Sequence, residues 1–384
     1  MKILFIHTCN MMRDGEDSAV ANEIELLRSH GIEAELLSFN NDGKNAFLRL
    51  LQMPFNFKSY WAVKKKIRSF KPHIVHIHQL HFAASPSVIY AAKSYKVPVV
   101  YTLHNYNLLC PSGLLFFKEK MFMNSINKSF PLEAVKKKVY LNSRYKTFWF
   151  SFTLWLHQTW RTWNTVDRFI VYSEYAKKIF VQSKLHSIAD KMEVVPNFCI
   201  PYDDRSVEEQ DEGYYIYVGT LTYDKGIPVM LEAFADNKLP LKIIGNGPLE
   251  PLVKGYGLHY PNIRFVGYKP KDEVFNLLEH ATALIFPSLW LEPFGMVIAE
   301  AFSKGTPVIA CDQGNLKEMI NSGYNGLKFE TNNDKELRIK VDYYEALSKE
   351  EKAVYRRNAK NTYLKKYAPE LHAEQLLNIY QSML

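Results

Sequence analysis

The chain has 384 residues and carries 48 Lys and Arg against 40 Asp and Glu, a net charge of +8. Its 47% hydrophobic and 23% charged residues exclude a disordered chain, and it is too long for one typical core, so we expect two domains. The longest apolar and aromatic run, 147–156, is shorter than the roughly 20 residues that a membrane-spanning helix requires.

The first half of the chain alternates predicted strands with amphipathic helices. Its expected strands are 2–7, 32–39, 73–78, 97–103 and 167–172. Between them, segment 18–31 places Val20, Ile24 and Leu27 at helical spacing, with Gly31 as the expected stop. This alternation predicts a parallel, doubly wound α/β sheet with right-handed crossovers.

The second half repeats the pattern after an acidic, proline-bearing segment without a hydrophobic period, 196–213. Its expected strands are 214–219, 241–245, 263–267, 282–286 and 307–310. We therefore predict two Rossmann-like domains, 1–200 and 214–365, joined by a linker at 201–213. A ligand cleft is expected between them, outside the carboxyl ends of the strands. The last helix, about 366–384, can remain on the second domain or pack back onto the first.

Glycine turns follow the predicted strands of the second half. They contain Gly219, Lys225–Gly226, Gly245, Gly247 and Gly267, and a further helix begins near Gly295 or Met296. Glycine lets the backbone approach a ligand closely, and the amides of a helix N-terminus bind phosphate. A lysine beside them supplies the charge that a diphosphate requires. An ordinary strand-to-helix turn explains each glycine alone, but several turns at one sheet edge indicate a nucleotide.

Two glutamates, Glu292 and Glu300, stand in a segment with almost no other charge. Pro293 and Gly295 prevent one helix from including both. We expect Glu292 on the loop before a helix and Glu300 about one turn inside it, near the positive end of the helix dipole. The amides of 294–296 can then face a phosphate between the two carboxylates. The alternative is a helix cap with a buried ion pair.

These motifs resemble those of the retaining glycosyltransferases of family 4, which have the GT-B fold of two facing Rossmann-like domains. The most specific element is the glutamate pair in “EPFGMVIAEAFSKGTPVIA” at 292–310. The family's order and spacing also hold for “VPN” at 195–197, “KG” at 225–226, “GNGP” at 245–248 and “FVG” at 265–267. In the first half, segments 13–31, 73–116 and 166–180 resemble the acceptor domain of that family.

The resemblance implies a role for each matching position. Glu300 would hold the donor ribose, and Glu292 and His104 would lie at the transferred sugar. The diphosphate would meet Lys225 and the amides of Phe294, Gly295 and Met296, and the base would meet the backbone of Val266 and Gly267. Gly219 and Gly247 would also belong to the donor site. The loop around Gly15, with Asn105, would approach the donor or the acceptor.

The resemblance also implies the reaction partners. The donor would be a UDP-sugar or GDP-sugar, and neither a metal nor another cofactor is expected, because lysine and helix amides neutralise the leaving diphosphate. The acceptor would be a hydroxyl of a glycan or a lipid-linked sugar, most naturally in cell-surface polysaccharide synthesis.

Two features of the chain depart from the family pattern. Thr220 replaces its usual arginine, so that phosphate contact is missing or is supplied by Lys242, Arg264 or a residue of the other domain. No cysteine cluster follows “LLCPSGLLF”.

The charge is unevenly distributed. Residues 1–200 contain 27 Lys and Arg against 14 Asp and Glu, and segment 44–71 has basic residues but no acid. Basic residues interleaved with aromatic ones suit an anionic membrane surface, and a solvated basic face is the alternative. No nucleic-acid-binding motif accompanies the charge, so nucleic acid is not expected as a partner.

Single cysteines and the lack of a signal peptide predict a cytoplasmic protein, with peripheral attachment to the inner membrane face as an option.

Four histidines, His73, His76, His78 and His81, lie close enough in sequence to raise the question of zinc. His76 and His78 share one face of a strand while His73 points the other way, so hydrogen-bonded strand-end histidines are favoured over a metal site.

Three function classes remain for the chain. The first is a retaining glycosyltransferase, and the second is a catalytically silent nucleotide-sugar-binding or scaffold protein on the same fold, for which Thr220 is the best argument. The third is an epimerase or phosphorylase, although no lysine with a supporting motif for pyridoxal phosphate is present. The intact set of Glu292, Glu300 and Lys225 favours the transferase.

Overall fold

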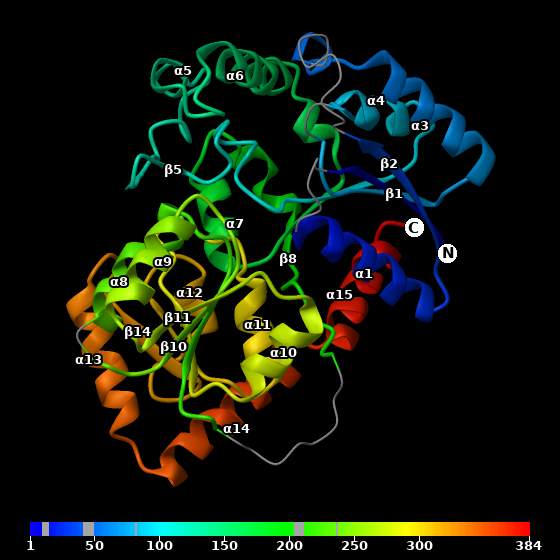
Figure 1. Cartoon of the computed structure of the whole chain (residues 1–384). Coiled ribbons are helices and arrows are strands. Elements are labelled where there is room, and N and C mark those ends of the chain that lie inside the picture. The colour runs from blue at the N-terminus through cyan, green and yellow to red at the C-terminus, as the bar shows by residue number, and fades with distance from the viewer. Residues whose placement is uncertain (10–14, 41–49, 81–82, 203–210, 236) are drawn as a thin grey trace. The chain divides into compact units, whose positions relative to one another are not determined.

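The computed structural model describes residues 1–9, 15–40, 50–80, 83–202, 211–235 and 237–384. These residues form two compact units (Figure 1). Unit 1 comprises Met1–Val195 and His372–Leu384, and unit 2 comprises Pro196–Leu371. The boundary therefore precedes the predicted linker, most of which lies outside the described residues. Of the two placements left open for the last helix, the structure has it on unit 1 from His372 onward.

Unit 1 contains a parallel six-stranded sheet of order β2-β1-β3-β4-β7-β8 within the described residues. Its strands are β1 (Lys2–Cys9), β2 (Glu33–Asn40), β3 (Ile74–Ile77), β4 (Val99–Thr102), β7 (Arg168–Val171) and β8 (Met192–Val194), and a small antiparallel pair joins β5 (Phe116–Phe117) and β6 (Lys120–Met121). The chain proceeds outward from β1 to β2 and then returns to β3 on the other side of β1. This reversal is a topological switch point, where parallel sheets of this type bind ligands.

Helices flank both faces of this sheet, as right-handed crossovers require. They are α1 (Gly15–Ser29), α3 (Phe57–Phe70), α4 (Ser87–Lys93), α5 (Leu132–Lys137), α6 (Arg144–Thr159), α7 (Glu174–Val181) and α15 (Pro369–Gln381), with 3₁₀ turns at Thr162–Thr165 and His186–Lys191. The predicted apolar face of α1, with Val20, Ile24 and Leu27, is buried together with Leu376 and Tyr380 of α15. Figure 1 shows this C-terminal helix, in red, beside α1, in blue.

Unit 2 repeats the design with a second parallel sheet, of order β11-β10-β9-β12-β13-β14 within the described residues. Its strands are β9 (Tyr215–Val218), β10 (Leu241–Ile244), β11 (Ile263–Gly267), β12 (Ala283–Phe286), β13 (Val308–Cys311) and β14 (Gly326–Phe329). Its helices are η3 (Tyr223–Lys225), α8 (Ile227–Ala235), α9 (Glu250–His259), α10 (Lys271–Glu279), α11 (Met296–Ser303), α12 (Leu316–Met319), α13 (Asp334–Glu345) and α14 (Lys349–Lys366). The switch point of this sheet lies between β9 and β12.

All ten strands expected from the sequence are present. The central ones, such as β3 and β12, are apolar runs buried on both faces, whereas the edge strands β2 and β11 are mostly half-buried or exposed. The edge strands β8 and β14 were not predicted. In β8 the residues are Met192, Glu193 and Val194, and β14 contains Gly326 and Lys328, so both lack a continuous apolar run. None of the described helices is both long and apolar enough to cross a bilayer.

Candidate functional site

The strand-end loops of unit 2 are joined to one another by backbone hydrogen bonds at one edge of the sheet. The nitrogen-to-oxygen pairs are Gly245 to Gly267 at 3.0 Å, Leu221 to Asn246 at 2.8 Å and Leu289 to Asp224 at 2.7 Å. Loops that follow four different strands, β9, β10, β11 and β12, therefore form one connected surface. The turns singled out in the sequence thus lie at a single edge.

The glycines of these turns are needed mainly for the loops to approach each other. A Cβ on Gly245 would lie 1.9 Å from the carbonyl oxygen of Gly219, and one on Gly226 would lie 1.9 Å from that of Pro287. Gly226 also has a φ of +69°, which disfavours other residues. Only at Gly267, among these turns, is the space within 4 Å of a Cβ open. Contact with a ligand therefore remains a possible reason for the glycine at position 267. At the other glycines of these turns, the close packing of neighbouring atoms is the reason.

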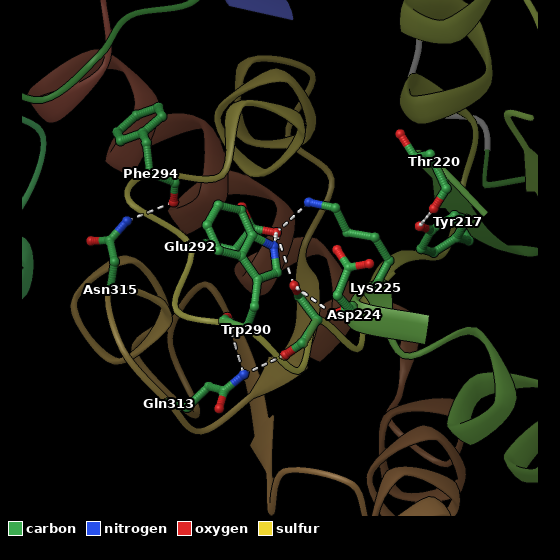
Figure 2. Close-up of polar contacts among 10 residues, drawn as sticks. Tyr217, Thr220, Asp224, Lys225, Trp290, Glu292, Phe294, Gln313 and Asn315 are labelled. Atoms are coloured by element: carbon green, nitrogen blue, oxygen red, sulfur yellow. Dashed lines mark hydrogen bonds and ion pairs between the residues drawn. The ribbon is translucent and has the colours of Figure 1, made fainter. Parts of the chain in front are cut away.

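An ion pair bridges the switch point of unit 2 (Figure 2). Lys225 follows β9, Glu292 follows β12, and the Lys225 Nζ lies 2.6 Å from the Glu292 Oε1. The same oxygen accepts hydrogen bonds from Ser288 Oγ at 2.8 Å and from Trp290 Nε1 at 2.7 Å. Three donors thus hold a carboxylate that is only 6% exposed. Among the described residues, these contacts all use Oε1, so Oε2 is available to accept ligand hydroxyls.

The loop that carries Glu292 is fixed from β13 and the segment after it. Gln313 Nε2 donates to the carbonyl of Ser288 at 2.5 Å, and Asn315 Nδ2 donates to the carbonyl of Phe294 at 2.6 Å (Figure 2). The Phe294 ring packs edge-on against Tyr367 with centroids 5.4 Å apart. These contacts leave the loop little freedom, so the Glu292 carboxylate is preorganised.

Glu300 has its own lysine partner. It lies in α11, is 8% exposed, and its Oε1 is 3.3 Å from Lys271 Nζ at the start of α10. Burial raises the pKa of Glu300, and the nearby Lys271 offsets part of this effect. The structure therefore gives each glutamate of the motif a cation, as the buried ion-pair alternative anticipated, and it places both around the start of α11 as expected.

The start of α11 leaves backbone amides without a side-chain cap. Gly295 is the N-cap residue with a φ of +107°, and no side-chain hydrogen bond caps the helix there. Met296, the first residue of α11, is half-buried. At a helix start without a side-chain cap, the helix dipole favours an anion. The geometry is compatible with the role that the sequence predicted for the amides of Phe294, Gly295 and Met296.

Thr220 stands where the resemblance to family 4 leads us to expect an arginine. Thr220 is exposed, and its carbonyl accepts a hydrogen bond from the hydroxyl of Tyr217 at 2.9 Å. Burial, with the charges of Glu292 and Asp224, holds the pKa of Tyr217 well above its usual value, so the hydroxyl keeps its proton. Lys242 does not replace the arginine, because its Nζ is 3.5 Å from Glu212 near the amino ends of the strands.

His104 of unit 1 is held by two hydrogen bonds just beyond β4. Its Nε2 lies 2.9 Å from His78 Nδ1, and its Nδ1 lies 3.0 Å from the Tyr172 hydroxyl. Burial, reinforced by His78, holds the pKa of His104 well below its usual value, so this imidazole is neutral. Contact with a sugar would therefore require one of these two hydrogen bonds to be exchanged.

Gly15 and Asn105 belong to the same edge of the unit 1 sheet. Gly15 is the first residue of α1, and the following residue, Glu16, accepts hydrogen bonds from Asn105 Nδ2 at 3.4 Å and Gln79 Nε2 at 3.1 Å. The loop before Gly15 lies outside the described residues. The structure thus connects the two positions predicted for the donor or acceptor loop.

The histidine-rich segment forms hydrogen bonds, as expected. His76 Nε2 lies 2.7 Å from Thr102 Oγ1, and its Nδ1 lies 2.6 Å from the Tyr380 hydroxyl. His73 is on the other side of the strand, where its Nδ1 accepts from the Lys2 amide. His81 lies outside the described residues.

Two family models match consecutive parts of the chain. The model described as “Glycosyltransferase Family 4” covers residues 18–200, and the one described as “Glycosyl transferases group 1” covers 201–362. The chain belongs to the group 1 glycosyltransferases. Both the resemblance seen in the motifs and the GT-B fold predicted from it are confirmed.

Curated relatives of this glycosyltransferase family member match only part of it. An uncharacterized glycosyltransferase of Methanocaldococcus jannaschii is 33% identical over 135 residues, 35% of this chain and 38% of that protein. The O-antigen chain mannosyltransferase C of Escherichia coli is 28% identical over 148 residues, 36% of this chain and 40% of that protein. The chain thus spans less than half the length of these relatives.

A solved structure matches this family member over its full length. The Anabaena protein HepE, in complex with UDP-glucose, superposes with a TM-score of 0.66 over 100% of both chains at 16% sequence identity. At this identity the similarity establishes the GT-B fold.

Several residues that complete the site were not found from the sequence. They are Lys271, Ser288, Trp290, Gln313 and Asn315. Trp290 and Ser288 lie within four positions of Glu292, so their proximity was a usable signal. The contacts of Lys271 and Gln313 could not be predicted from nearby residues in the sequence, because these contacts depend on which strands are neighbours.

Proposed function

We propose that this protein transfers a sugar, with retention of configuration, from a nucleoside-diphosphate sugar to a hydroxyl of a glycan or lipid-linked acceptor. The observation that carries this proposal is the Lys225–Glu292 pair, which spans the switch point between β9 and β12. Ligands of doubly wound sheets bind outside the carboxyl ends of the strands at such a point. The HepE structure, which contains UDP-glucose, supports this class of donor.

The site divides into phosphate-binding and hydroxyl-binding parts. The ammonium group of Lys225 and the first-turn amides of α11 would meet the diphosphate, so the departure of the leaving group needs no metal ion. Glu292 Oε2 would accept hydrogen bonds from hydroxyls of the transferred sugar. Glu300 would accept hydrogen bonds from the ribose hydroxyls, and the nucleotide base would lie in the open space beside Gly267.

For the chemical step we propose displacement on the same face as the leaving group. A double displacement would need a carboxylate nucleophile opposite the leaving group. Both carboxylates of the motif are already committed to lysines, Glu292 to Lys225 and Glu300 to Lys271. In our proposal a donor phosphate oxygen accepts the proton of the acceptor hydroxyl. A glycosyl-enzyme trapped by mass spectrometry would overturn this step.

We also propose that the acceptor belongs to cell-surface polysaccharide synthesis and that unit 1 reaches it at an anionic membrane surface. The similarity to an O-antigen mannosyltransferase supports the pathway class. For the surface, α3 exposes Phe57 by 68% and Trp61 by 57%, and Lys58 and Lys65 on the same helix are also exposed. Exposed aromatic rings among lysines are suited to the interface of an anionic bilayer.

The second candidate function is a nucleotide-sugar-binding protein without catalytic activity. Thr220 favours it, because the family's usual arginine is missing and Lys242 points elsewhere. Both candidates bind a nucleotide, so turnover of a sugar donor separates them.

The first experiment is calorimetric titration with UDP, GDP, ADP and CDP in the absence of divalent metal. We expect one diphosphate to bind selectively and to add roughly 2.7 kcal/mol of stability at 100 times its dissociation constant. Glu300→Gln should abolish this binding, whereas Glu273→Gln, at an exposed surface ion pair of α10, should preserve it. Failure of all four nucleotides to bind would refute the proposed donor site.

A further inference from the structure

Helix α6 of unit 1 has an aromatic ridge on the side opposite its buried residues. The buried side includes Phe150, Leu154 and His157. On the opposite side, five aromatic residues follow one another at helical spacing: Tyr145, Phe148, Trp149, Phe152 and Trp155. Tyr145 and Phe148 are 43% and 42% exposed, and the other three are half-buried. A surface helix ordinarily has polar residues on its outer side, so this ridge indicates a partner.

The rings of the ridge pack against one another along the helix. The centroids of Tyr145 and Trp149 are 6.3 Å apart, and those of Trp149 and Phe152 are 5.6 Å apart. Phe152 and Trp155 continue the row at 5.8 Å. At the rise of an α-helix, this row is about 15 Å long. It is therefore a continuous apolar patch, unlike the scattered apolar side chains of an ordinary surface.

Basic residues surround the ridge. Segment 132–161 contains six Lys and Arg against one acid, Glu133. The basic residues are Lys136, Lys137, Lys138, Arg144, Lys146 and Arg161. All of them except Lys146 are exposed, and Glu133 is paired with Lys137 at 2.7 Å. Helix α5, with its lysines, packs against α6 (Figure 1). The surroundings of the ridge are thus positively charged.

The carboxyl end of α6 is joined to the amino end of α3 through packed rings. The His157 ring lies 6.2 Å from Tyr90, which packs against Phe55 at 6.1 Å. Phe55 in turn lies 4.8 Å from Phe57, the first residue of α3. On the α6 side, Trp160 lies 5.7 Å from His157 and is 54% exposed. Exposed rings of α3 and α6 therefore border one aromatic cluster.

We propose that α6 is an interfacial helix that inserts its aromatic ridge among the acyl chains of an anionic bilayer, while the lysines of α3 and α5 meet the headgroups. A helix with an aromatic face and basic flanks binds at this boundary, where buried apolar area and attraction to anionic lipids add together. The proposal rests on the membrane surface proposed for unit 1, but it does not depend on sugar transfer.

A second copy of the chain is the other occupant that such an aromatic face could take. The charge of the surroundings argues against it. Two copies that met through this ridge would bring their basic flanks together, and like charges across an interface are unfavourable. An anionic lipid surface supplies the opposite charge over the whole area.

Fluorescence quenching by lipids with bromine deep in their acyl chains tests the insertion of α6. With the whole chain on phosphatidylcholine–phosphatidylglycerol vesicles, we expect strong quenching of tryptophan. The double variant Trp149→Phe/Trp155→Phe keeps aromatic rings on the ridge but should lose most of this quenching. Trp163→Phe is the matched control in the same unit, because Trp163 is only 3% exposed and should contribute little. Unchanged quenching in the double variant would overturn the proposal.

Sedimentation with the same vesicles tests the two contributions to binding. Phe148→Ser should weaken binding roughly tenfold, because an exposed ring no longer enters the bilayer. Lys136→Gln with Lys138→Gln should weaken it roughly tenfold at low salt and much less at high salt. Leu258→Ser is the control, since this residue of α9 in unit 2 is apolar and 86% exposed but lies outside the ridge. It should leave binding unchanged.

Three further results would overturn the proposal in distinguishable ways. Failure of the unmodified protein to bind anionic vesicles would refute it together with the membrane surface of unit 1. Binding that is weakened by Trp61→Ser but not by Phe148→Ser would refute the role of α6 and leave the surface of α3 standing. Self-association without lipid that Phe148→Ser abolishes would assign the ridge to a second copy.

Nucleotide titration of the same protein separates this inference from the proposed function. We expect Phe148→Ser to bind the nucleoside diphosphate as the unmodified protein does, because the ridge lies in unit 1 and the donor site in unit 2. Loss of nucleotide binding in this variant would show that the substitution disturbs more than the membrane contact. Absence of nucleotide binding to the unmodified protein would refute the donor site and leave the vesicle results standing.

Discussion

Lys225→Met tests whether the Lys225–Glu292 pair stabilises unit 2. The Glu292 side chain is 7% exposed and that of Lys225 is 24% exposed, so the substitution leaves a carboxylate buried without its cation. Breaking such a pair costs about 3–5 kcal/mol. Because Ser288 and Trp290 still donate to the Glu292 Oε1, we expect a smaller loss, about 2–3 kcal/mol.

The assay is thermal and urea unfolding of the full-length protein. For a unit of this size the loss corresponds to a decrease in Tm of about 5–10 °C. Lys254→Met is the matched control, since its Nζ lies 2.7 Å from Glu250 but its side chain is 58% exposed. That change should cost less than about 0.5 kcal/mol.

A double variant separates the ion pair from the general loss of a side chain. Adding Glu292→Gln to Lys225→Met removes the unpaired charge while an amide oxygen can still accept from Trp290. The double variant should therefore be more stable than Lys225→Met alone, by about 1–2 kcal/mol. A double variant that is no more stable than Lys225→Met would refute the idea that the unpaired Glu292 charge causes the loss of stability.

Three further predictions concern other parts of the molecule. Gly226→Ala should destabilise unit 2 by at least about 2 kcal/mol in urea unfolding, because its Cβ would clash with the Pro287 carbonyl, whereas Gly255→Ala in α9 has open space and should stabilise it by up to about 1 kcal/mol. Since burial raises the pKa of Glu300 above its ordinary 4.5, the unfolded chain loses this proton first and stability falls as pH rises above that value. Glu300→Gln should flatten this fall in urea midpoints across pH, and an unaltered slope would contradict it. Trp61→Ser should weaken sedimentation with anionic vesicles, because it removes an exposed ring from α3, and unchanged sedimentation would contradict the proposed membrane surface.

The sequence was sufficient for ten strands of the two parallel sheets and for the position of the glutamate motif. Short apolar runs that alternate with helical periods specify a doubly wound sheet, because its central strands are buried on both faces. Pro293 and Gly295 keep the preceding segment out of the helix, so α11 starts at Met296 as expected. These features depend on residues that are close in sequence, where sterics and hydrophobic period act directly.

The partners of the site residues could not be predicted in the same way. Glu292 was expected at the transferred sugar or in a buried ion pair, but the sequence did not identify the three donors that hold its Oε1. Lys225 reaches it because β9 and β12 are neighbours in the sheet, and nothing local in either segment specifies that neighbourhood. The same holds for Lys271 and Glu300.

The sequence by itself determined the family, the two parallel sheets and the candidate site residues at their strand ends. Only the tertiary structure decided which of these residues face each other. Glu23 and His372 stand 349 positions apart, yet they share a hydrogen bond in the core of unit 1. The reason is that strand order and helix packing are set by burial of the whole chain, and a buried carboxylate then takes the cation or donor that this packing brings within reach.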